Sequence, residues 1–217
     1  MLDKLIIVIL ARKGSRRLKN KNILLFHKKP LITWTIEQSI RMKNFAEQII
    51  VSTDCKKILS YEKVYKNVTF LKRPAYLSKN NSSSFDVLKH IFRKIKYEGN
   101  VILLQPTSPL RKDQDILNVR KLLSKGRSPI MSVCKAPHNS ELMTHKNKNY
   151  KFKPLNYKKL DVFYPNGAIY GANTSWINKN ISFYSDKTFL YFMSEKDSID
   201  IDYEYQFVMA EALFKKK

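Results

Sequence analysis

Short runs of apolar residues recur along the chain, and polar or amphipathic segments separate them. Runs rich in Ile, Val and Leu predict buried strands, at 5–10, 48–53, 68–71, 100–105 and 130–133. Apolar residues that recur every three or four positions predict the intervening helices. These are expected at 31–40 behind Pro30, through Ile58 and Leu59 with Asp54 as the cap, after 82–84 with Val87, Leu88, Ile91 and Ile95 on one side, and at 113–123. This alternation favours an α/β fold with a mostly parallel central sheet and helices on both faces.

The alternation fails between Cys134 and Pro165. This stretch is polar, rich in Lys and Asn, and interrupted by proline. We therefore expect a single domain over 1–217, in which 134–165 forms an inserted arm or a small antiparallel subdomain. Regular structure is expected to resume at 167–170, and helical spacing of apolar residues predicts an amphipathic helix at the C-terminus.

The composition indicates a globular and strongly basic protein. Of 217 residues, 43% are hydrophobic and 12% aromatic, and the formal net charge is +23. Such a charge favours anionic partners: nucleic acid, an anionic membrane or a polyanionic small substrate. Lys and Arg are scattered along the chain, without a basic tail or zinc-finger spacing, which favours a lysine-rich surface over a nucleic-acid function.

The number and spacing of the cysteines indicate the cellular compartment of the protein. Cys55 and Cys134 are far apart and form no CxxC pair, so neither a structural zinc site nor a disulfide framework is expected. The first apolar run is too short for a signal peptide, and no apolar stretch reaches membrane-spanning length. We expect a cytoplasmic protein with reduced thiols and no membrane partner.

A basic loop follows the first predicted strand. Residues 11–22 contain six Lys or Arg together with Gly14 and Ser15. Ligands of open α/β sheets bind at the carboxyl ends of the strands. Here Gly14 permits close approach of the backbone, whose N–H groups can bind an anion while the cations neutralise a polyphosphate. A solvated basic loop without a ligand is the alternative.

Three further segments carry candidate chemistry. In Gln105–Arg111, two prolines stiffen a polar turn whose hydroxyls, amide and guanidinium can face a ligand cleft, although a structural turn is also compatible with the pattern. Asn166–Tyr170 is an Asn-Gly turn before a strand, a weak signal. In 198–202, alternation places Asp200 and Asp202 on one face, where two carboxylates and substrate phosphates can hold Mg²⁺; a half-buried edge strand is the alternative.

Taken in order, these segments resemble the acylneuraminate cytidylyltransferase family, the CMP-sialic acid synthetases. The resemblance covers nearly the whole chain and rests on Ala-Arg-x-Gly-Ser, Lys21-Asn22, Arg73-Pro74, the Gln105–Arg111 segment, the Asn166–Tyr170 segment and Ser-Ile-Asp-Ile-Asp at 198–202. It implies a Rossmann-like nucleotidyltransferase that uses CTP and Mg²⁺. A nonulosonic acid sugar attacks the α-phosphorus through its anomeric hydroxyl, and pyrophosphate leaves.

The resemblance also implies roles for individual residues. Arg12 and Lys21 would hold the triphosphate, and Asp200 and Asp202 would carry the metal; these four form the implied catalytic set. The nucleotide site would comprise Ala11, Arg12, Gly14, Ser15, Lys21, Asn22, Arg73 and Ser84. The sugar side would comprise Gln105, Thr107, Ser108, Lys158, Lys159, Asn166 and Tyr170. Family dimers exchange an arm near the partner's sugar site, which implies a homodimer here.

The sequence departs from the family on the sugar side. An Arg-Gln pair before Leu-Pro is replaced by 156–161, which has neither the arginine nor the proline, and a family lysine is not evident in 137–141. Lys158 or Lys159 is the nearest cation for the sugar carboxylate. The sugar is therefore expected to be a nonulosonic acid other than N-acetylneuraminate, such as legionaminic or pseudaminic acid. Gln206 also replaces a family Asp, at a position outside the metal pair.

Three other functions remain open. One is a nucleotidyltransferase for the eight-carbon sugar Kdo or for a sugar phosphate. Another is a basic domain that binds nucleic acid without catalysis, and the third is a catalytically inactive homologue.

Overall fold

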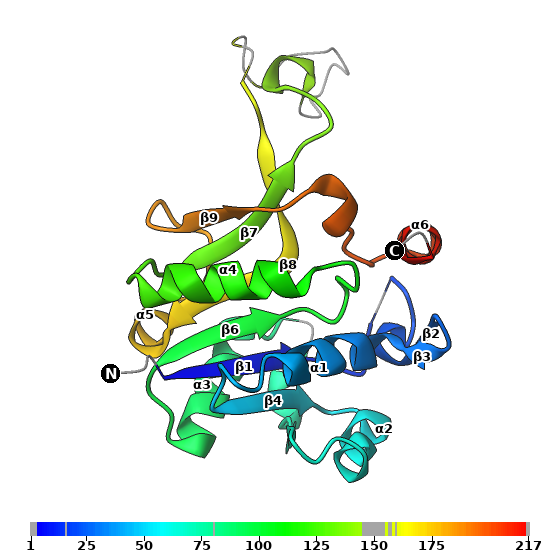
Figure 1. Cartoon of the computed structure of the whole chain (residues 1–217), viewed down its shortest axis with the longest axis vertical. Coiled ribbons are helices and arrows are strands. Elements are labelled where there is room, and N and C mark those ends of the chain that lie inside the picture. Colours follow the sequence, from blue (N-terminus) through cyan, green and yellow to red (C-terminus); the bar gives the residue numbers. More distant parts are fainter. Residues whose placement is uncertain are drawn as a thin grey trace.

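The computed structural model describes residues 4–15, 17–79, 81–144, 155, 158 and 160–215. A seven-stranded sheet forms its centre, in the order β5-β4-β1-β6-β8-β7-β9 (Figure 1). The strands are β1 (Leu5–Leu10), β4 (Gln48–Thr53), β5 (Thr69–Lys72), β6 (Asn100–Leu104), β7 (Ile130–Lys135), β8 (Phe163–Asn173) and β9 (Phe189–Phe192). All five strands expected from the apolar runs are confirmed, and their ends differ by no more than about two residues.

The sheet is mostly parallel, as expected. Strand β1 pairs in parallel with β4 and β6, and β7 pairs in parallel with β9. Strand β8 runs antiparallel to both β6 and β7, and it is much longer than the segment 167–170 that the sequence indicated. Parallel strands covered on both faces are apolar throughout, which is why β1 reads as an uninterrupted apolar run.

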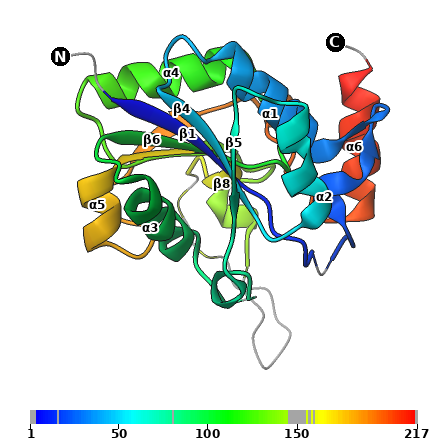
Figure 2. The ribbon, with the colours of Figure 1, turned by 90° about the horizontal axis from the view of Figure 1, so that it is seen from below.

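Helices cover both faces of the sheet (Figure 2). On one face lie α1 (Leu31–Arg41), α2 (Lys56–Leu59) and α4 (Asp113–Ser124), and on the other lie α3 (Ser84–Ile95) and α5 (Thr174–Lys179). Each face of the sheet has its own hydrophobic core, and alternate residues of β1 pack into one or the other. Ile7 and Ile9 pack with α1 and α4, whereas Ile6 and Val8 pack with α3. This two-layered core confirms the α/β architecture.

The start of α2 differs from the sequence expectation. Cys55, not Asp54, precedes the helix, and its N–H donates to Thr53 Oγ1 at 3.0 Å. The Asp54 carboxylate instead accepts a hydrogen bond from the backbone N–H of Lys13 at 2.7 Å. The prediction that Asp54 caps the helix is therefore wrong, because its carboxylate is used to hold the basic loop.

The described residues 134–144 and 160–165 project from the sheet as an extension of β7 and β8 (Figure 1). The two strands continue into this extension, and the N–H of Ala136 donates to the carbonyl of Val162 at 2.7 Å. Farther out, the hydroxyl of Ser140 donates to the carbonyl of Lys158 at 2.7 Å. Part of the predicted arm, including Lys159, lies outside the described residues.

The C-terminal helix forms as predicted. Helix α6 (Glu204–Phe214) packs its Ala210 face against Phe26 of the hairpin formed by β2 (Leu25–Phe26) and β3 (Lys29–Pro30). Ile201 lies in the same small core. The segment that carries Asp200 and Asp202 is therefore anchored by packing at its centre and by α6 at its end. None of the helices in the described part of the chain combines the length and apolar character that crossing a bilayer requires.

Candidate active site

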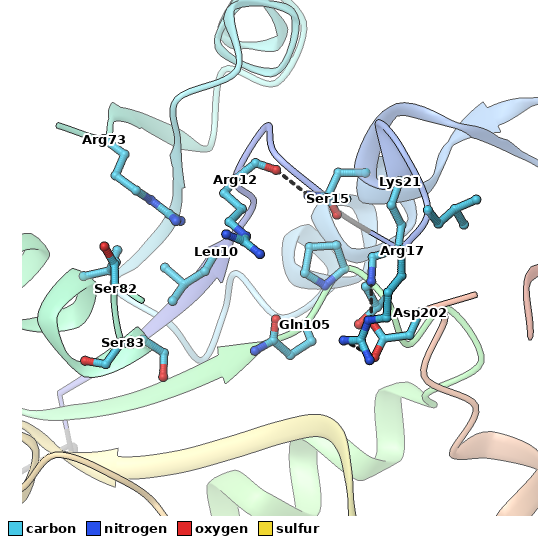
Figure 3. A pocket seen from close by; sticks show the side chains of 16 residues that line it. Leu10, Arg12, Ser15, Arg17, Lys21, Arg73, Ser82, Ser83, Gln105 and Asp202 are labelled. Carbon is cyan, nitrogen blue, oxygen red and sulfur yellow. Dashed lines mark hydrogen bonds and ion pairs between the residues drawn. The ribbon is translucent and has the colours of Figure 1, made fainter. Parts of the chain in front are cut away.

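A cavity of about 490 Å³ opens at the carboxyl ends of β1, β5 and β6. Parallel strands that end together bring sequence-distant segments to one edge, which is where open α/β sheets bind ligands. Figure 3 shows Arg12, Arg73 and Gln105 reaching into the cavity from three different segments. Its lining is formed by Leu10, Arg12, Ser15, Arg17, Leu18, Lys21, Asn22, Arg73, Ser82, Ser83, Ser84, Val87, Gln105, Pro106, Thr107 and Asp202.

The basic loop after β1 supplies one wall. Asn22 is buried, and its side-chain amide donates to the carbonyl of Arg12 at 3.1 Å, which braces the loop across its base. Arg12, Ser15, Lys21 and Asn22 all line the cavity. The loop therefore brings together four of the residues expected at the nucleotide.

Two other residues expected in this loop have different positions. Ala11 is fully buried in the core beneath the cavity, and its N–H donates to the carbonyl of Ser52 at 3.0 Å. Gly14 is exposed, and a Cβ added there would meet nothing within 4 Å. The folded chain by itself does not require a glycine at this position.

Asp202 lies on the opposite wall and is held by two cations. Lys21 Nζ lies 2.8 Å from Oδ1 of Asp202, and a terminal guanidinium nitrogen of Arg17 lies 2.7 Å from Oδ2 (Figure 3). Lys21 was expected beside a phosphate, and the structure also places it against the predicted metal ligand. Arg17 was not expected at the site; its membership of the same basic loop was the only signal.

Asp200 lies beside this pair in a more buried position. Burial raises the pKa of the Asp200 carboxyl, and the charge of Asp202 acts in the same direction, while a hydrogen bond with Thr107 and the charge of Lys21 oppose the shift. One oxygen, Oδ1, is buried and has no hydrogen-bond partner among the described residues. A buried carboxylate oxygen without a partner is costly, so a ligand at this atom would stabilise the site.

Gly167 makes room for Asp200. Its φ is +73°, and an added Cβ would lie 3.0 Å from Oδ2 of Asp200. The turn at 166–167, a weak signal in the sequence, therefore matters because the backbone closely approaches a carboxylate.

The turn at 105–111 connects the two walls. The N–H of Ile201 donates to the carbonyl of Thr107 at 2.8 Å, which fixes the segment of Asp200 against the turn. Gln105 and Thr107, both expected on the sugar side, line the cavity. Ser108 does not: it is fully buried, and its hydroxyl has no hydrogen-bond partner in the described structure.

The sequence allows the Arg111 guanidinium to face the cleft, but the structure places it in the interior. Its guanidinium donates to the carbonyls of Ala168 at 2.8 Å and Gln105 at 3.2 Å, and to Gln38 Oε1 at 3.0 Å. Burial lowers the pKa of Arg111 to about 10. Arg111 thus ties the end of β6 to β8 and α1, and it holds the backbone of Gln105 in place.

Arg73 and the start of α3 complete the cavity. Arg73 is buried at the wall, where it donates to the carbonyl of Ser52 at 2.8 Å and to the Ser52 hydroxyl at 3.2 Å, and burial lowers its pKa to about 10. Ser84 lines the cavity as expected. Ser83, which was not expected there, caps α3 by accepting from the N–H of Asp86 at 3.0 Å. The other unexpected lining residues are Leu10, Leu18, Ser82, Val87 and Pro106.

Three further sugar-side residues that the structure describes, Lys158, Asn166 and Tyr170, are not part of the cavity lining. Asn166 is buried; its amide oxygen accepts from Ser132 at 2.6 Å and its amide nitrogen donates to Ser198 at 2.8 Å. Tyr170 packs in the core, with its ring centroid 4.7 Å from that of Phe183. Asn166 therefore links β8 to β7 and to the segment before Asp200. Lys158 is exposed on the arm.

Comparison with protein families assigns nearly the whole chain to one family. The family model described as "Cytidylyltransferase" matches residues 6–213 of the chain. The match spans both walls of the cavity, the arm and the C-terminal helix.

Individual relatives agree with this assignment. An N-acylneuraminate cytidylyltransferase of Escherichia coli O18:K1:H7 is 33% identical over 227 residues, which cover 100% of this chain and 54% of that protein. A CMP-N,N'-diacetyllegionaminic acid synthase of Legionella pneumophila is 30% identical, with 98% of this chain and 97% of that protein covered. The chain thus spans about half the length of the N-acylneuraminate cytidylyltransferase and nearly the full length of the legionaminic acid synthase.

Solved structures confirm the fold. A CMP:2-keto-3-deoxy-manno-octonic acid synthetase complexed with CTP superposes with a TM-score of 0.72 at 17% identity, covering 98% of this chain and 99% of that one. A 4-diphosphocytidyl-2C-methyl-D-erythritol synthase gives 0.75 at 7% identity, with 98% of each chain covered.

Proposed function

The chain belongs to the cytidylyltransferase family, and on that premise we propose that it transfers CMP from CTP to a nonulosonic acid, with release of pyrophosphate. One observation carries the proposal: a single cavity has a strongly basic loop on one wall and the Asp200–Asp202 pair beside the other. Phosphoryl transfer needs little more than positioned phosphates, neutralised charge and an aligned nucleophile. This cavity supplies groups for the first two requirements from its own side chains.

In the proposed complex, CTP lies along the basic loop. Arg12 and Lys21 hold the triphosphate, because both line the cavity and charge-assisted contacts to phosphate are among the stronger hydrogen bonds. Asn22, Arg73 and Ser84 lie along the rest of the lining and form the nucleoside part of the site. Arg73 is already oriented by Ser52, so its guanidinium presents a fixed surface to the nucleotide.

Mg²⁺ fits the carboxylate pair. Asp200 offers a buried oxygen that has no hydrogen-bond partner in the described part of the chain, and Asp202 brings a second carboxylate to the cavity. Carboxylate oxygens suit a hard cation. Among the described residues no group of three or more His, Cys, Asp or Glu side chains could hold a metal, so the pair depends on substrate phosphates and water for further ligands. When bound, the ion neutralises charge on the reacting phosphates.

The sugar lies on the side of Gln105 and Thr107, whose side chains line the cavity next to Asp202. Its anomeric hydroxyl attacks the α-phosphorus and releases its proton to solvent, while the bond from that phosphorus to the bridging oxygen breaks and pyrophosphate leaves. We propose Lys158 or Lys159 as the cation for the sugar carboxylate. A lysine does not reproduce the bidentate contact of an arginine, so we propose a sugar other than N-acetylneuraminate as the preferred substrate.

We also propose a homodimer located in the cytoplasm. Phe163, Tyr164 and Phe192 are exposed where β8 and β9 meet the arm, and the rings of Phe163 and Phe192 contact each other with centroids 4.8 Å apart. Exposed aromatic clusters of this kind mark association sites. Both cysteines are free thiols, which fits a reducing compartment, and the proposed reaction consumes a nucleoside triphosphate.

A turnover screen tests the function. The protein is incubated with Mg²⁺, each of the four nucleoside triphosphates, and N-acetylneuraminic, legionaminic, pseudaminic or Kdo sugar acid, and pyrophosphate release is measured. We expect activity with CTP and a nine-carbon acid, and its loss in Asp202→Asn. Turnover with Kdo alone would favour the eight-carbon alternative, and no turnover with any pair would contradict the proposal.

A further inference from the structure

Both carboxylate oxygens of Asp202 are already engaged by cations of the basic loop. Lys21 lies 2.8 Å from Oδ1 and Arg17 lies 2.7 Å from Oδ2. A divalent cation that binds Asp202 must therefore displace one of them or share an oxygen with it. The question is therefore which of the two side chains, Lys21 or Arg17, a metal ion would displace.

The two cations differ in how firmly they are held. The Lys21 side chain is only 12% exposed, and the backbone of Lys21 begins the 3-10 turn Lys21–Ile23. The Arg17 side chain, in contrast, is 54% exposed. Arg17 also contacts Tyr203: a side-chain hydrogen bond with Tyr203 raises the pKa of Arg17, and the ring lies 5.3 Å from the guanidinium, but Tyr203 is itself exposed. An ion pair open to solvent contributes little to stability, so Arg17 is the cation that can leave at small cost.

The balance of charges around Asp202 favours displacement of a side-chain cation when a metal ion binds. In the structure, the two negative charges of Asp200 and Asp202 face the two positive charges of Arg17 and Lys21. A divalent cation would neutralise the pair alone and would repel both side chains. Arg17 also lines the nucleotide cavity, so a displaced guanidinium remains beside the phosphates.

We propose that Arg17 is a positioning residue that occupies Asp202 in the metal-free protein and moves to the nucleotide phosphates when a divalent cation binds. Before metal binding, Arg17 neutralises and orients the carboxylate. Afterwards it adds a charge-assisted contact to the triphosphate. The inference rests on the proposed metal role of Asp200 and Asp202.

Metal binding without nucleotide tests the first half of the exchange. Free Mn²⁺ is titrated by electron paramagnetic resonance into the wild type, Arg17→Ala and Arg17→Lys. Removing a competing exposed ion pair and its repulsion of the metal should lower the Kd for Mn²⁺ in Arg17→Ala roughly fivefold. Lysine keeps the charge, so Arg17→Lys should stay near the wild type.

Arg120→Ala is the matched control. Arg120 lies on α4 over the ring of Phe45 at 4.6 Å, outside the cavity lining, so this variant loses the same charge and a similar ring contact. Its Mn²⁺ affinity should equal that of the wild type. Equal affinities in Arg17→Ala and Arg120→Ala, or weaker binding in Arg17→Ala, would overturn the exchange.

CTP binding tests the second half. In saturating Mg²⁺, calorimetry should show CTP affinity roughly tenfold lower in Arg17→Ala, since a contact to a charged group is lost. Unchanged CTP affinity would overturn the move to phosphate. Asp202→Asn separates this inference from the proposed function: if that variant binds Mn²⁺ as tightly as the wild type, the metal pair itself is wrong.

Discussion

An ideal Cβ on Gly167 would lie 3.0 Å from Oδ2 of Asp200, and the backbone at Gly167 has a φ of +73°. Any other residue there must adopt a left-handed conformation and push against the carboxylate. We therefore expect Gly167→Ala to lower the free energy of unfolding by about 1–3 kcal/mol and to weaken Mn²⁺ binding, measured by urea unfolding and by metal titration.

Gly126→Ala is the control for that prediction. Gly126 has a similar φ of +74°, but an added Cβ would meet nothing within 4 Å. This variant should lose stability through backbone strain alone and keep the metal affinity of the wild type. Equal metal affinity in both variants would show that the close approach of Gly167 to Asp200 does not matter.

The basic loop should lose nucleotide affinity when its cavity-lining cations are removed. Arg12→Ala and Lys21→Ala each remove a cation that lines the cavity, and we expect CTP to bind roughly tenfold more weakly in calorimetry. Lys19→Ala is the control, because Lys19 is exposed on the same loop and is not part of the lining. A loss of similar size in all three variants would indicate a general effect of charge.

Arg111 should contribute to stability without contacting a substrate. Arg111→Met removes a buried guanidinium and leaves the carbonyls of Gln105 and Ala168 without their donor. Each buried acceptor left without a donor costs about 1–3 kcal/mol, so we expect a loss of about 2–5 kcal/mol in urea unfolding. Because the backbone of Gln105 then loosens, the KM for the sugar should rise more than the KM for CTP. A stable variant with unchanged kinetics would contradict both parts.

The exposed aromatic cluster of Phe163, Tyr164 and Phe192 should lie in the interface of the proposed dimer. Phe192→Asp places a charge in that cluster, and sedimentation velocity at micromolar concentration should then show a monomer where the wild type is a dimer. Val64→Asp is the control, since Val64 is 71% exposed after α2, in a different part of the chain. A monomeric wild type would refute the dimer.

The sequence by itself determined the elements that depend on local patterns. Strand β1 was predicted correctly because a central parallel strand is apolar on both faces, and α4 because its apolar residues recur at helical spacing. The resemblance to a known family added the cytidylyltransferase assignment.

Only the tertiary structure decided which polar side chains reach the cavity. Arg12 and Arg111 both follow a central strand, yet Arg12 lines the cavity while Arg111 is buried, because α1 and β8 offer Arg111 the acceptors of Gln38 and Ala168. Arg17 reaches Asp202 although the two residues are 185 positions apart along the chain. Such partners come from segments that meet only when the sheet assembles. The local sequence around Arg12, Arg17 or Arg111 therefore cannot predict which acceptors will lie near each guanidinium.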